Sequence, residues 1–294
     1  MSDSQVELQQ PQDISQVIAL LAEHKGRAKL IAGGTDLIVD LKNEQTWPGM
    51  LISLAGVEGL DAIEERSGEL VIGAMVTPNA ILESPLVQER LPALADAART
   101  MASYQVRNLA TLGGNLCSAS PSADLPPALV AAGAWAVIQN QQGEIRIALH
   151  DFFTGPRETA LEEGTVLTHV VVPPLPSRTG IAYHPFKLRG ANALAVAAAA
   201  VRLTLDKKGS IDEAVVVLGA VAPKPMAAVK AGKLLQGEQP SPELFDKAAA
   251  QASQESKPIA DVRGTVAHRK ALIEVLTRRA LNQALARAQE GGGR

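Results

Sequence analysis

The sequence predicts an α+β protein in three parts, and three observations indicate this class. Short apolar runs alternate with segments of helical spacing along the first 172 residues, which is typical of mixed helix and sheet. The pair Pro173-Pro174 interrupts regular structure and marks a boundary. After it, two strand candidates precede three helix candidates. We therefore expect a small N-terminal α/β part, a larger mixed part, and a C-terminal part with an antiparallel sheet and helices.

The first part is expected to contain a helix, two short strands and a glycine turn. Residues 11–23 place apolar side chains at mostly helical spacing, and Asp13 is the candidate N-terminal cap. Residues 29–32 form a strand candidate that leads directly into two glycines, and residues 37–41 continue as one turn of helix or a short strand. A further strand is expected at residues 50–54.

The second part begins with a strand and a capped helix. Residues 70–74 are apolar, and Thr77 followed by Pro78 is a typical helix start. Asn140-Gln141-Gln142-Gly143 separates two strand candidates and predicts a hairpin. The remaining elements expected here are helices at 92–101 and 126–133, the hairpin strands 134–139 and 144–149, and a strand at 166–172.

The third part is expected to combine a strand pair with three helices. Asp206-Lys207-Lys208-Gly209 forms the turn between the two strands. The expected strands are 193–205 and 211–220, and the expected helices are 225–235, 242–253 and 266–288. With the prolines as a boundary, the predicted domains are residues 1–58, 59–176 and 177–294.

Composition and charge exclude several classes of function. Lys and Arg number 28 against 31 Asp and Glu, so no strong basic field favours nucleic acid or an anionic membrane surface. No apolar run approaches the roughly 18 residues that span a bilayer, and the N-terminus lacks the pattern of a secretory signal. We therefore expect a cytoplasmic protein that binds neither nucleic acid nor membrane. Cys117 is the only cysteine and the five histidines are scattered, so we expect no disulfide, no iron–sulfur cluster of the chain's own, no metal site and no catalytic constellation.

Two glycine pairs are the strongest functional signal in the chain. They are Gly33-Gly34, followed by Thr35-Asp36, and Gly113-Gly114, which lies between Thr111-Leu112 and Asn115. Glycine lets backbone N–H groups converge on an anion and tolerates positive φ. A single pair is more often a tight turn with no ligand, but two in one chain indicate a diphosphate held from two sides. Neither matches GxGxxG or GxxxxGK[ST], so a dinucleotide Rossmann site and a phosphate-transferring P-loop are disfavoured.

These segments resemble the FAD-binding subunits of the molybdenum hydroxylases, the family that includes xanthine dehydrogenase and carbon monoxide dehydrogenase. Residues 32–37 are similar to the family's first pyrophosphate loop, and residues 107–115 to its second. The match continues through residues 118–124 and reappears at 261–264 and 278–281. It implies the two-subdomain FAD-binding fold of the vanillyl-alcohol-oxidase (PCMH) type plus a C-terminal domain. FAD is then expected between the first two parts, with its flavin end at the third.

The resemblance also implies which residues hold FAD. On one side of the pyrophosphate it implies backbone N–H groups of eight consecutive residues: Ile31, Ala32, Gly33, Gly34, Thr35, Asp36, Leu37 and Ile38. Thr111, Gly114 and Asn115 are implied to close the other side. Met101 falls where some relatives place an aromatic ring against the flavin, and methionine supplies no ring at that position.

Three further positions match the family beyond the pyrophosphate loops. Asp124 corresponds to an acidic residue that bonds polar groups on the adenosine part of the cofactor, and its alternative role is a helix cap ahead of Pro126-Pro127. Leu167 corresponds to an apolar residue packed near the flavin, with a buried strand residue as the equal alternative. Lys187 corresponds to a lysine close to the isoalloxazine ring, where a cation stabilises the anionic reduced flavin and raises its potential. From the residues alone, Lys187 is interpreted as a surface lysine.

The function implied by the resemblance is electron transfer inside a larger enzyme. The implied partners are a small subunit with [2Fe-2S] clusters and a large molybdopterin subunit, in a dimer of heterotrimers, and this chain's FAD passes electrons to an external acceptor. Residues 190–194 lack the acidic side chains of some NAD-reducing relatives, so the acceptor stays open. The alternatives are a self-contained flavin oxidoreductase of the vanillyl-alcohol-oxidase type, for which 294 residues leave little room, and a flavin-free interaction subunit.

Overall fold

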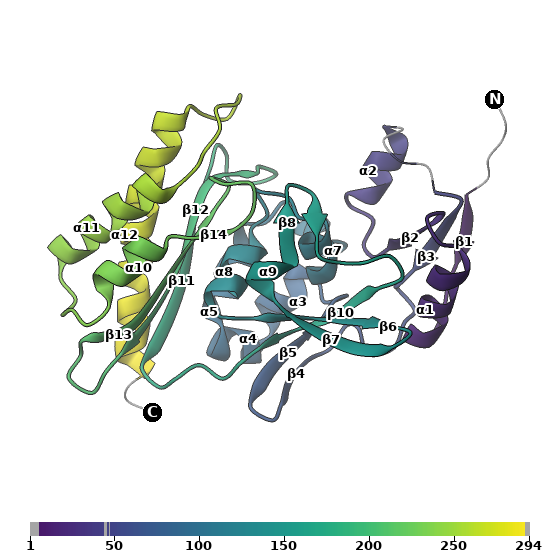
Figure 1. Ribbon diagram of the computed structural model, residues 1–294, viewed down its shortest axis with the longest axis horizontal. Coiled ribbons are helices and arrows are strands. Elements are labelled where there is room, and N and C mark those ends of the chain that lie inside the picture. The colour runs from purple at the N-terminus through teal and green to yellow at the C-terminus, as the bar shows by residue number, and fades with distance from the viewer. Residues whose placement is uncertain (1–5, 44–45, 47, 292–294) are drawn as a thin grey trace.

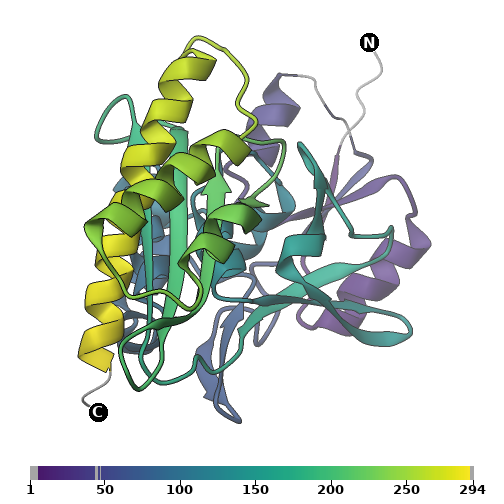
Figure 2. The ribbon, with the colours of Figure 1, turned by 60° about the vertical axis from the view of Figure 1, so that its left-hand side comes forward.

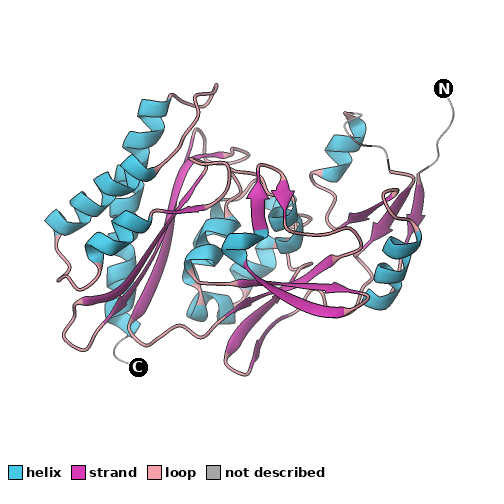
Figure 3. Cartoon of the chain, viewed as in Figure 1, coloured by secondary structure: helices cyan, strands magenta, loops and turns pink. Residues whose placement is uncertain are grey.

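The computed structural model describes residues 6–43, 46 and 48–291, and three main sheets with their helices make up this part of the chain (Figures 1 and 3). The sheets follow one another along the molecule in chain order, from the purple N-terminal part to the green and yellow C-terminal part (Figure 1). The mixture of helices with largely antiparallel sheets confirms the predicted α+β class. The outer ends of the first and third predicted domains lie outside the described residues.

The N-terminal part is a three-stranded parallel sheet with two helices. Its elements are β1 (Glu7–Gln9), α1 (Ile14–Glu23), β2 (Ala28–Ile31), α2 (Leu37–Lys42) and β3 (Met50–Ser53). The strand order is β1-β3-β2, and the apolar face of α1 packs against Met50 and Ile52 of β3. As expected, Asp13 caps α1: its Oδ1 accepts a hydrogen bond from the Gln16 N–H at 3.0 Å.

The middle part is an antiparallel sheet that packs against a group of short helices. Its strands are β4 (Ile63–Arg66), β5 (Glu69–Gly73), β6 (Trp135–Asn140), β7 (Gly143–Ala148) and β10 (Val166–Val172), in the order β4-β5-β10-β6-β7, with a small hairpin of β8 (Phe153–Gly155) and β9 (Glu158–Thr159). Its helices are α3 (Pro78–Glu83), α4 (Pro85–Arg90), α5 (Pro92–Thr100), α6 (Tyr104–Arg107), α7 (Leu112–Cys117), α8 (Leu125–Ala131) and α9 (Leu149–Phe152). The predicted cap of α3 is present, because Thr77 Oγ1 accepts from the Ala80 N–H at 3.2 Å.

The C-terminal part is an antiparallel sheet between two layers of helices. It consists of β11 (Thr179–Lys187), β12 (Ala195–Leu205), β13 (Ile211–Gly219), β14 (Met226–Ala227), α10 (Val229–Leu235), α11 (Pro242–Glu255) and α12 (Val266–Glu290), with strand order β11-β12-β13-β14. Helices α10 to α12 cover one face, which Figure 2 brings forward. Helices α5 and α8 of the middle part cover the other face.

Burial on both faces explains the composition of β11 and β12. Side chains alternate between the two faces of a strand: Ile181 and Tyr183 pack on the α5 and α8 side, whereas Ala182 packs on the α12 side. The alanine-rich strand β12 is buried in the same alternating way. Small side chains there let helices approach closely from both sides. The arrangement carries Tyr183 and the strand end at Lys187 to the start of α8.

Among the elements that were not expected from the sequence, β11 and α7 contribute to the candidate site. Strand β11 contains Pro185, which argues against a central strand, and the structure places it at the edge of its sheet, where proline is tolerated. Helix α7 begins at Leu112 and holds the second glycine pair in its first turn, in a segment that was expected to be a loop. In residues 6–43, 46 and 48–291, every helix is too short or too polar to cross a bilayer.

Candidate cofactor-binding site

The first glycine pair is required by a close contact and by backbone conformation. A Cβ on Gly33 would lie 1.6 Å from the carbonyl oxygen of Leu109, so the backbone of one loop rests on that of the other. Gly34 has φ = +70°, a conformation that costs other L-residues about 1–2 kcal/mol. The two loops, far apart in sequence, therefore meet at a position where only glycine fits.

Residues 32–37, which we call the donor segment, follow β2 and hold unused hydrogen-bond donors. Their backbone N–H groups donate to no acceptor within the described part of the chain. The next N–H, that of Ile38, donates to the Gly34 carbonyl at 3.0 Å. Backbone N–H groups are strong donors that are normally paired. Consecutive free N–H groups at a glycine turn form a concavity that suits an anion.

The second glycine pair is built differently, because its donors are used within the protein. The Gly113 N–H donates to the Ala74 carbonyl at 2.7 Å, and the Gly114 N–H donates to Thr111 Oγ1 at 3.0 Å. The Asn115 N–H donates to the Thr111 carbonyl at 2.9 Å. A Cβ on Gly113 would lie 2.8 Å from Ala74 Cβ. Here glycine lets the first turn of α7 lie against the segment after β5.

The Asn115 side chain is the polar group that α7 leaves without a partner. Its Oδ1 is buried and makes no hydrogen bond within the described structure. A buried polar atom without a partner is uncommon in folded proteins and points to an absent ligand or water. Of the three residues predicted for this side of the pyrophosphate, Asn115 is thus the one whose side chain remains available.

A side-chain hydrogen bond joins the two glycine regions. The Ser118 hydroxyl, at the end of α7, donates to Asp36 Oδ2 at 2.6 Å. Asp36 accordingly makes no capping bond to α2. The donor segment and α7 are therefore connected twice, by this bond and by the contact between Gly33 and Leu109.

A buried asparagine that the sequence analysis missed holds the segment leading into the second pair. Asn79 Nδ2 donates to Asn108 Oδ1 at 2.6 Å, and the Arg107 Nε donates to Asn79 Oδ1 at 3.0 Å. Arg107 also donates to the Met101 carbonyl at 2.8 Å. This network fixes residues 101–108. Arg107 and Asn108 belong to the motif matched in sequence, but no local pattern indicates that Asn79 is their partner.

A buried ion pair lies where β11 ends against α8. Lys187 Nζ donates to Asp124 Oδ2 at 2.8 Å and to the Thr100 carbonyl at 2.5 Å. The Tyr183 hydroxyl donates to Asp124 Oδ1 at 2.9 Å. The side chains of Lys187 and Asp124 are each only 8% exposed. Lys187 is thus no surface lysine, and the alternative role of Asp124 as a helix cap is wrong because its side chain makes no capping bond.

Burial dominates the electrostatics of this group. It raises the pKa of the Asp124 carboxyl, and the charge and hydrogen bond of Lys187 with the Tyr183 hydrogen bond oppose that shift. Burial, together with the Asp124 charge, raises the pKa of Tyr183 well above its ordinary value. Tyr183 therefore stays protonated at neutral pH and remains a donor to Asp124.

Three residues that were expected to contact FAD lie together: Asp124, Lys187 and Met101. Asp124 and Lys187 touch each other, and Lys187 bonds the residue just before Met101. Asp124 and Lys187 thus form one bonded group, although they were expected at the adenosine and flavin ends of the cofactor respectively. Leu167 is 4% exposed and belongs to the core of the middle part, and the carbonyl of the next residue, Thr168, accepts from the Ala74 N–H at 2.8 Å.

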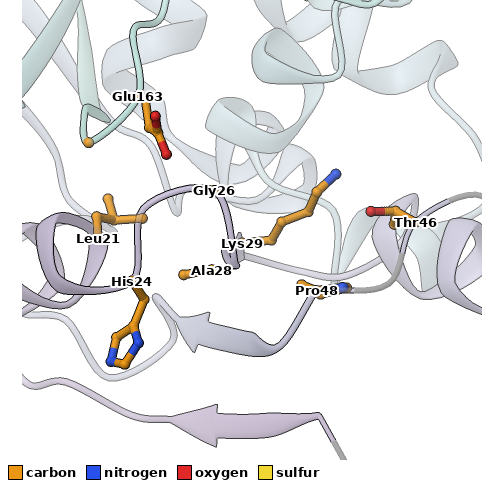
Figure 4. A pocket seen from close by; sticks show the side chains of 9 residues that line it. Leu21, His24, Gly26, Ala28, Lys29, Thr46, Pro48 and Glu163 are labelled. Carbon is orange, nitrogen blue, oxygen red and sulfur yellow. The ribbon is translucent and has the colours of Figure 1, made fainter. Parts of the chain in front are cut away.

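Two cavities of the described surface lie away from this site. One, of about 290 Å³, is lined by Leu21, His24, Lys29 and Glu163 among others and sits at the end of β2 opposite Gly33 (Figure 4). The other, of about 500 Å³, lies along the connection from β10 to β11. Neither is lined by the donor segment or by α7. The candidate site is therefore defined by its free donors and not by either of these cavities.

Comparison with known proteins agrees with this arrangement. Residues 4–175 match the model of the FAD binding domain in molybdopterin dehydrogenase, and residues 181–284 match that of the CO dehydrogenase flavoprotein C-terminal domain. The chain is 34% identical over 279 residues to the carbon monoxide dehydrogenase medium chain of Afipia carboxidovorans, covering 95% of this chain and 96% of the relative. It is 29% identical over 279 residues to the putative xanthine dehydrogenase FAD-binding subunit of Escherichia coli K12, covering 94% of each.

Solved structures give the same result for the fold. Carbon monoxide dehydrogenase from Hydrogenophaga pseudoflava matches with a TM-score of 0.92 and 34% identity over 96% of this chain and 98% of that chain. Quinoline 2-oxidoreductase from Pseudomonas putida 86 matches with a TM-score of 0.90 and 29% identity over 98% of each chain. The fold and its site thus define an FAD-binding subunit of an oxidoreductase. The chain belongs to the family of FAD-binding subunits of the molybdenum hydroxylases, and its cofactor is FAD.

Proposed function

We propose that this chain is the electron-transfer subunit of a multisubunit molybdenum hydroxylase, which receives electrons from [2Fe-2S] clusters of a partner subunit and delivers them to an external acceptor. The observation that carries the proposal is the donor segment, whose backbone N–H groups at Gly33-Gly34 are unused within the described structure. These donors suit a diphosphate that is held and not transferred.

In this proposal, different residues bind the pyrophosphate and the flavin of FAD. Residues 31–38 bind one side of the pyrophosphate through their N–H groups, and Thr111, Gly114 and Asn115 border the other side. Asp124 and Lys187 meet the flavin end, near Met101 and Leu167, with Lys187 held as a fixed cation by two acceptors. A fixed cation stabilises negative charge that develops nearby. FAD, when bound, supplies the ability to accept and release electrons.

The proposed partners are a small iron–sulfur subunit and a large molybdopterin subunit, in a dimer of heterotrimers. Support comes from relatives that are a medium chain of carbon monoxide dehydrogenase and a medium subunit of nicotine 6-hydroxylase. We also propose the domain division 1–58, 59–176 and 177–294 and keep the cytoplasmic location as a prediction. No substrate-oxidising residue is proposed in this chain.

The alternatives make different predictions about the isolated chain. A self-contained flavin oxidoreductase would oxidise a substrate alone, and a flavin-free interaction subunit would purify without colour. The donor segment favours an FAD-carrying chain over the second alternative. Relatives of the same length whose names describe one chain or subunit of a larger enzyme favour the complex over the first.

The test uses the chain and its partner subunits in one purified complex. Wild type should contain one FAD per chain, and flavin absorbance should bleach when the iron–sulfur subunit is reduced. Asn115→Asp places a like charge beside the diphosphate and should release FAD, while the clusters still become reduced and delivery to oxygen, quinone or NAD stops. Asn282→Ala, at an exposed residue of α12, is the control. A colourless wild type, or turnover by the chain alone, would contradict the proposal.

A further inference from the structure

The connection between α11 and α12 exposes apolar side chains at the surface. Val262 is 102% exposed relative to a free side chain and Ile259 is 71% exposed. Figure 1 shows this connection at the top of the view, extending beyond the sheet. The neighbouring connection from β11 to β12 exposes Leu188 and Leu194 in the same way. We call these four side chains the apolar tip.

The two connections are joined through the backbone around Val196. The guanidinium of Arg269 donates to the Val196 carbonyl at 2.7 Å, and a Cβ on Gly264 would lie 3.6 Å from Val196 Cγ1. Leu194 lies two residues before Val196 and Val262 two residues before Gly264. The apolar side chains therefore belong to one region of the surface. Single exposed apolar residues are ordinary, but a group of them marks an interaction site.

The loop that carries Val262 is held in one conformation. Asp261 and Gly264 exchange backbone hydrogen bonds at 3.2 and 3.1 Å. The Asp261 carboxylate accepts from Arg263 at 2.6 Å and from Arg269 at 2.7 Å. Arg269 is itself 1% exposed. Binding by a rigid loop loses less conformational entropy than binding by a loose one, so this loop is prepared for a partner.

Charges around the tip favour an acidic partner. Arg269 is buried, so the charges that the loop presents are the paired Asp261 and Arg263 and, at the start of the loop, the exposed Lys257. The hydrogen bonds from Arg263 hold the pKa of Asp261 well below its usual range, so this arrangement persists at physiological pH. The loop thus keeps a net positive charge beside its apolar side chains, and charges at the rim of an interface select a partner of opposite sign.

The loop also lies beside the flavin end of the proposed site. Arg263 donates to Ser122 Oγ at 3.2 Å, and Ser122 is two residues before Asp124, the partner of Lys187. The Asn192 N–H in the neighbouring connection donates to the Ala102 carbonyl at 3.2 Å, next to Met101. A protein seated on the apolar tip would therefore lie close to the place where electrons enter or leave.

We propose that the apolar tip is the docking element for the electron-donating partner, the subunit that carries iron–sulfur clusters, and that it inserts Val262 into an apolar pocket with an acidic rim. This inference rests on the proposed function. A rigid, fully exposed apolar residue surrounded by charge is suited to be a binding hot spot, whose loss weakens an interface about tenfold or more.

The test compares two valines in the complex, purified through a tag on this chain with the partner subunits co-expressed. Val262→Asp changes the tip, and Val229→Asp changes an exposed valine at the start of α10. We expect Val262→Asp to lower iron per FAD about tenfold after dilution and washing, with FAD per chain unchanged, and Val229→Asp to keep the wild-type ratio.

Several outcomes would overturn the docking proposal and leave the proposed function standing. One is a wild-type ratio of iron to FAD in Val262→Asp. Another is selective loss of molybdenum from Val262→Asp with iron retained, which would assign the apolar tip to the molybdopterin subunit. If wild type itself lacks FAD or retains no iron–sulfur partner, the proposed function fails first, and the docking proposal fails with it.

Discussion

At Gly33-Gly34 the backbone donors stay free, whereas at Gly113-Gly114 they are bonded within the protein. The two segments share the Gly-Gly dipeptide and differ in the residues beside it. The first follows a strand and forms an open turn with φ = +70° at Gly34. The second begins a helix whose N–H groups reach Ala74, Val76 and the Thr111 side chain. Gly33 and Gly113 both lack room for a Cβ, against Leu109 and Ala74 respectively, whereas Gly34 needs glycine for its positive φ beside the free donors.

We propose that the first pair serves the ligand, through its free backbone N–H groups, and that the second serves the fold, by holding α7 against the segment after β5. We therefore expect substitution of Gly34 to affect FAD binding and substitution of Gly113 to affect stability.

The largest effect is expected at Gly113. Gly113→Ala places a Cβ 2.8 Å from Ala74 Cβ and 2.9 Å from its carbonyl oxygen. Such overpacking costs about 1–3 kcal/mol of folding free energy, which urea unfolding of the FAD-free protein would measure. Gly190→Ala, where nothing lies within 4 Å of the new Cβ, is the control. An unchanged urea midpoint, accompanied by loss of FAD, would show that the second pair serves the ligand directly.

A smaller effect, and on a different quantity, is expected at Gly34. Gly34→Ala must either keep the strained positive φ or lose the arrangement of the donor segment. The strain of about 1–2 kcal/mol then falls on FAD binding, so the Kd for FAD should rise about tenfold while the FAD-free protein unfolds nearly as wild type.

Gly26→Ala supplies the matched control for that variant. Gly26 has φ = +68°, almost the value of Gly34, but lies after α1 and away from the donor segment. Gly26→Ala should leave the Kd for FAD unchanged, whether its strain is kept or relieved by a local shift of the backbone. Equal Kd values for FAD in Gly34→Ala and Gly26→Ala, measured by fluorescence titration, would contradict the proposal that Gly34 serves FAD binding.

Local features of the fold were predictable from the sequence because neighbouring residues determine them. The cap of α1 by Asp13 and the start of α3 at Thr77-Pro78 depend on a few consecutive residues, and both predictions are confirmed. Strand β11 was missed because Pro185 breaks the expected pattern, and only its edge position makes the proline acceptable. Helix α7 was missed because glycines disfavour helix, and here tertiary hydrogen bonds override that propensity.

In the candidate site, too, features set by neighbouring residues were predictable and contacts between distant segments were not. The glycine pairs could be found in sequence, but the partners of Asp124 could not, since Tyr183 and Lys187 reach it from another sheet. The same holds for Asn79, whose contacts with Arg107 and Asn108 depend on how α3 and α6 pack. A pattern in one segment carries no information about which distant segment will lie against it.

The smallest predicted effect concerns the bond that joins the two glycine regions. Ser118→Ala removes the hydroxyl that donates to Asp36, which is exposed, so the expected change is about 0.5 kcal/mol, or roughly a twofold rise in the Kd for FAD. Asp36→Ala alone is ambiguous, because it also removes a negative charge near the proposed diphosphate. A double-mutant cycle separates the two contributions. A coupling of about 0.5 kcal/mol would show that the second region acts on FAD partly through the first, and no coupling would show that the two regions act independently.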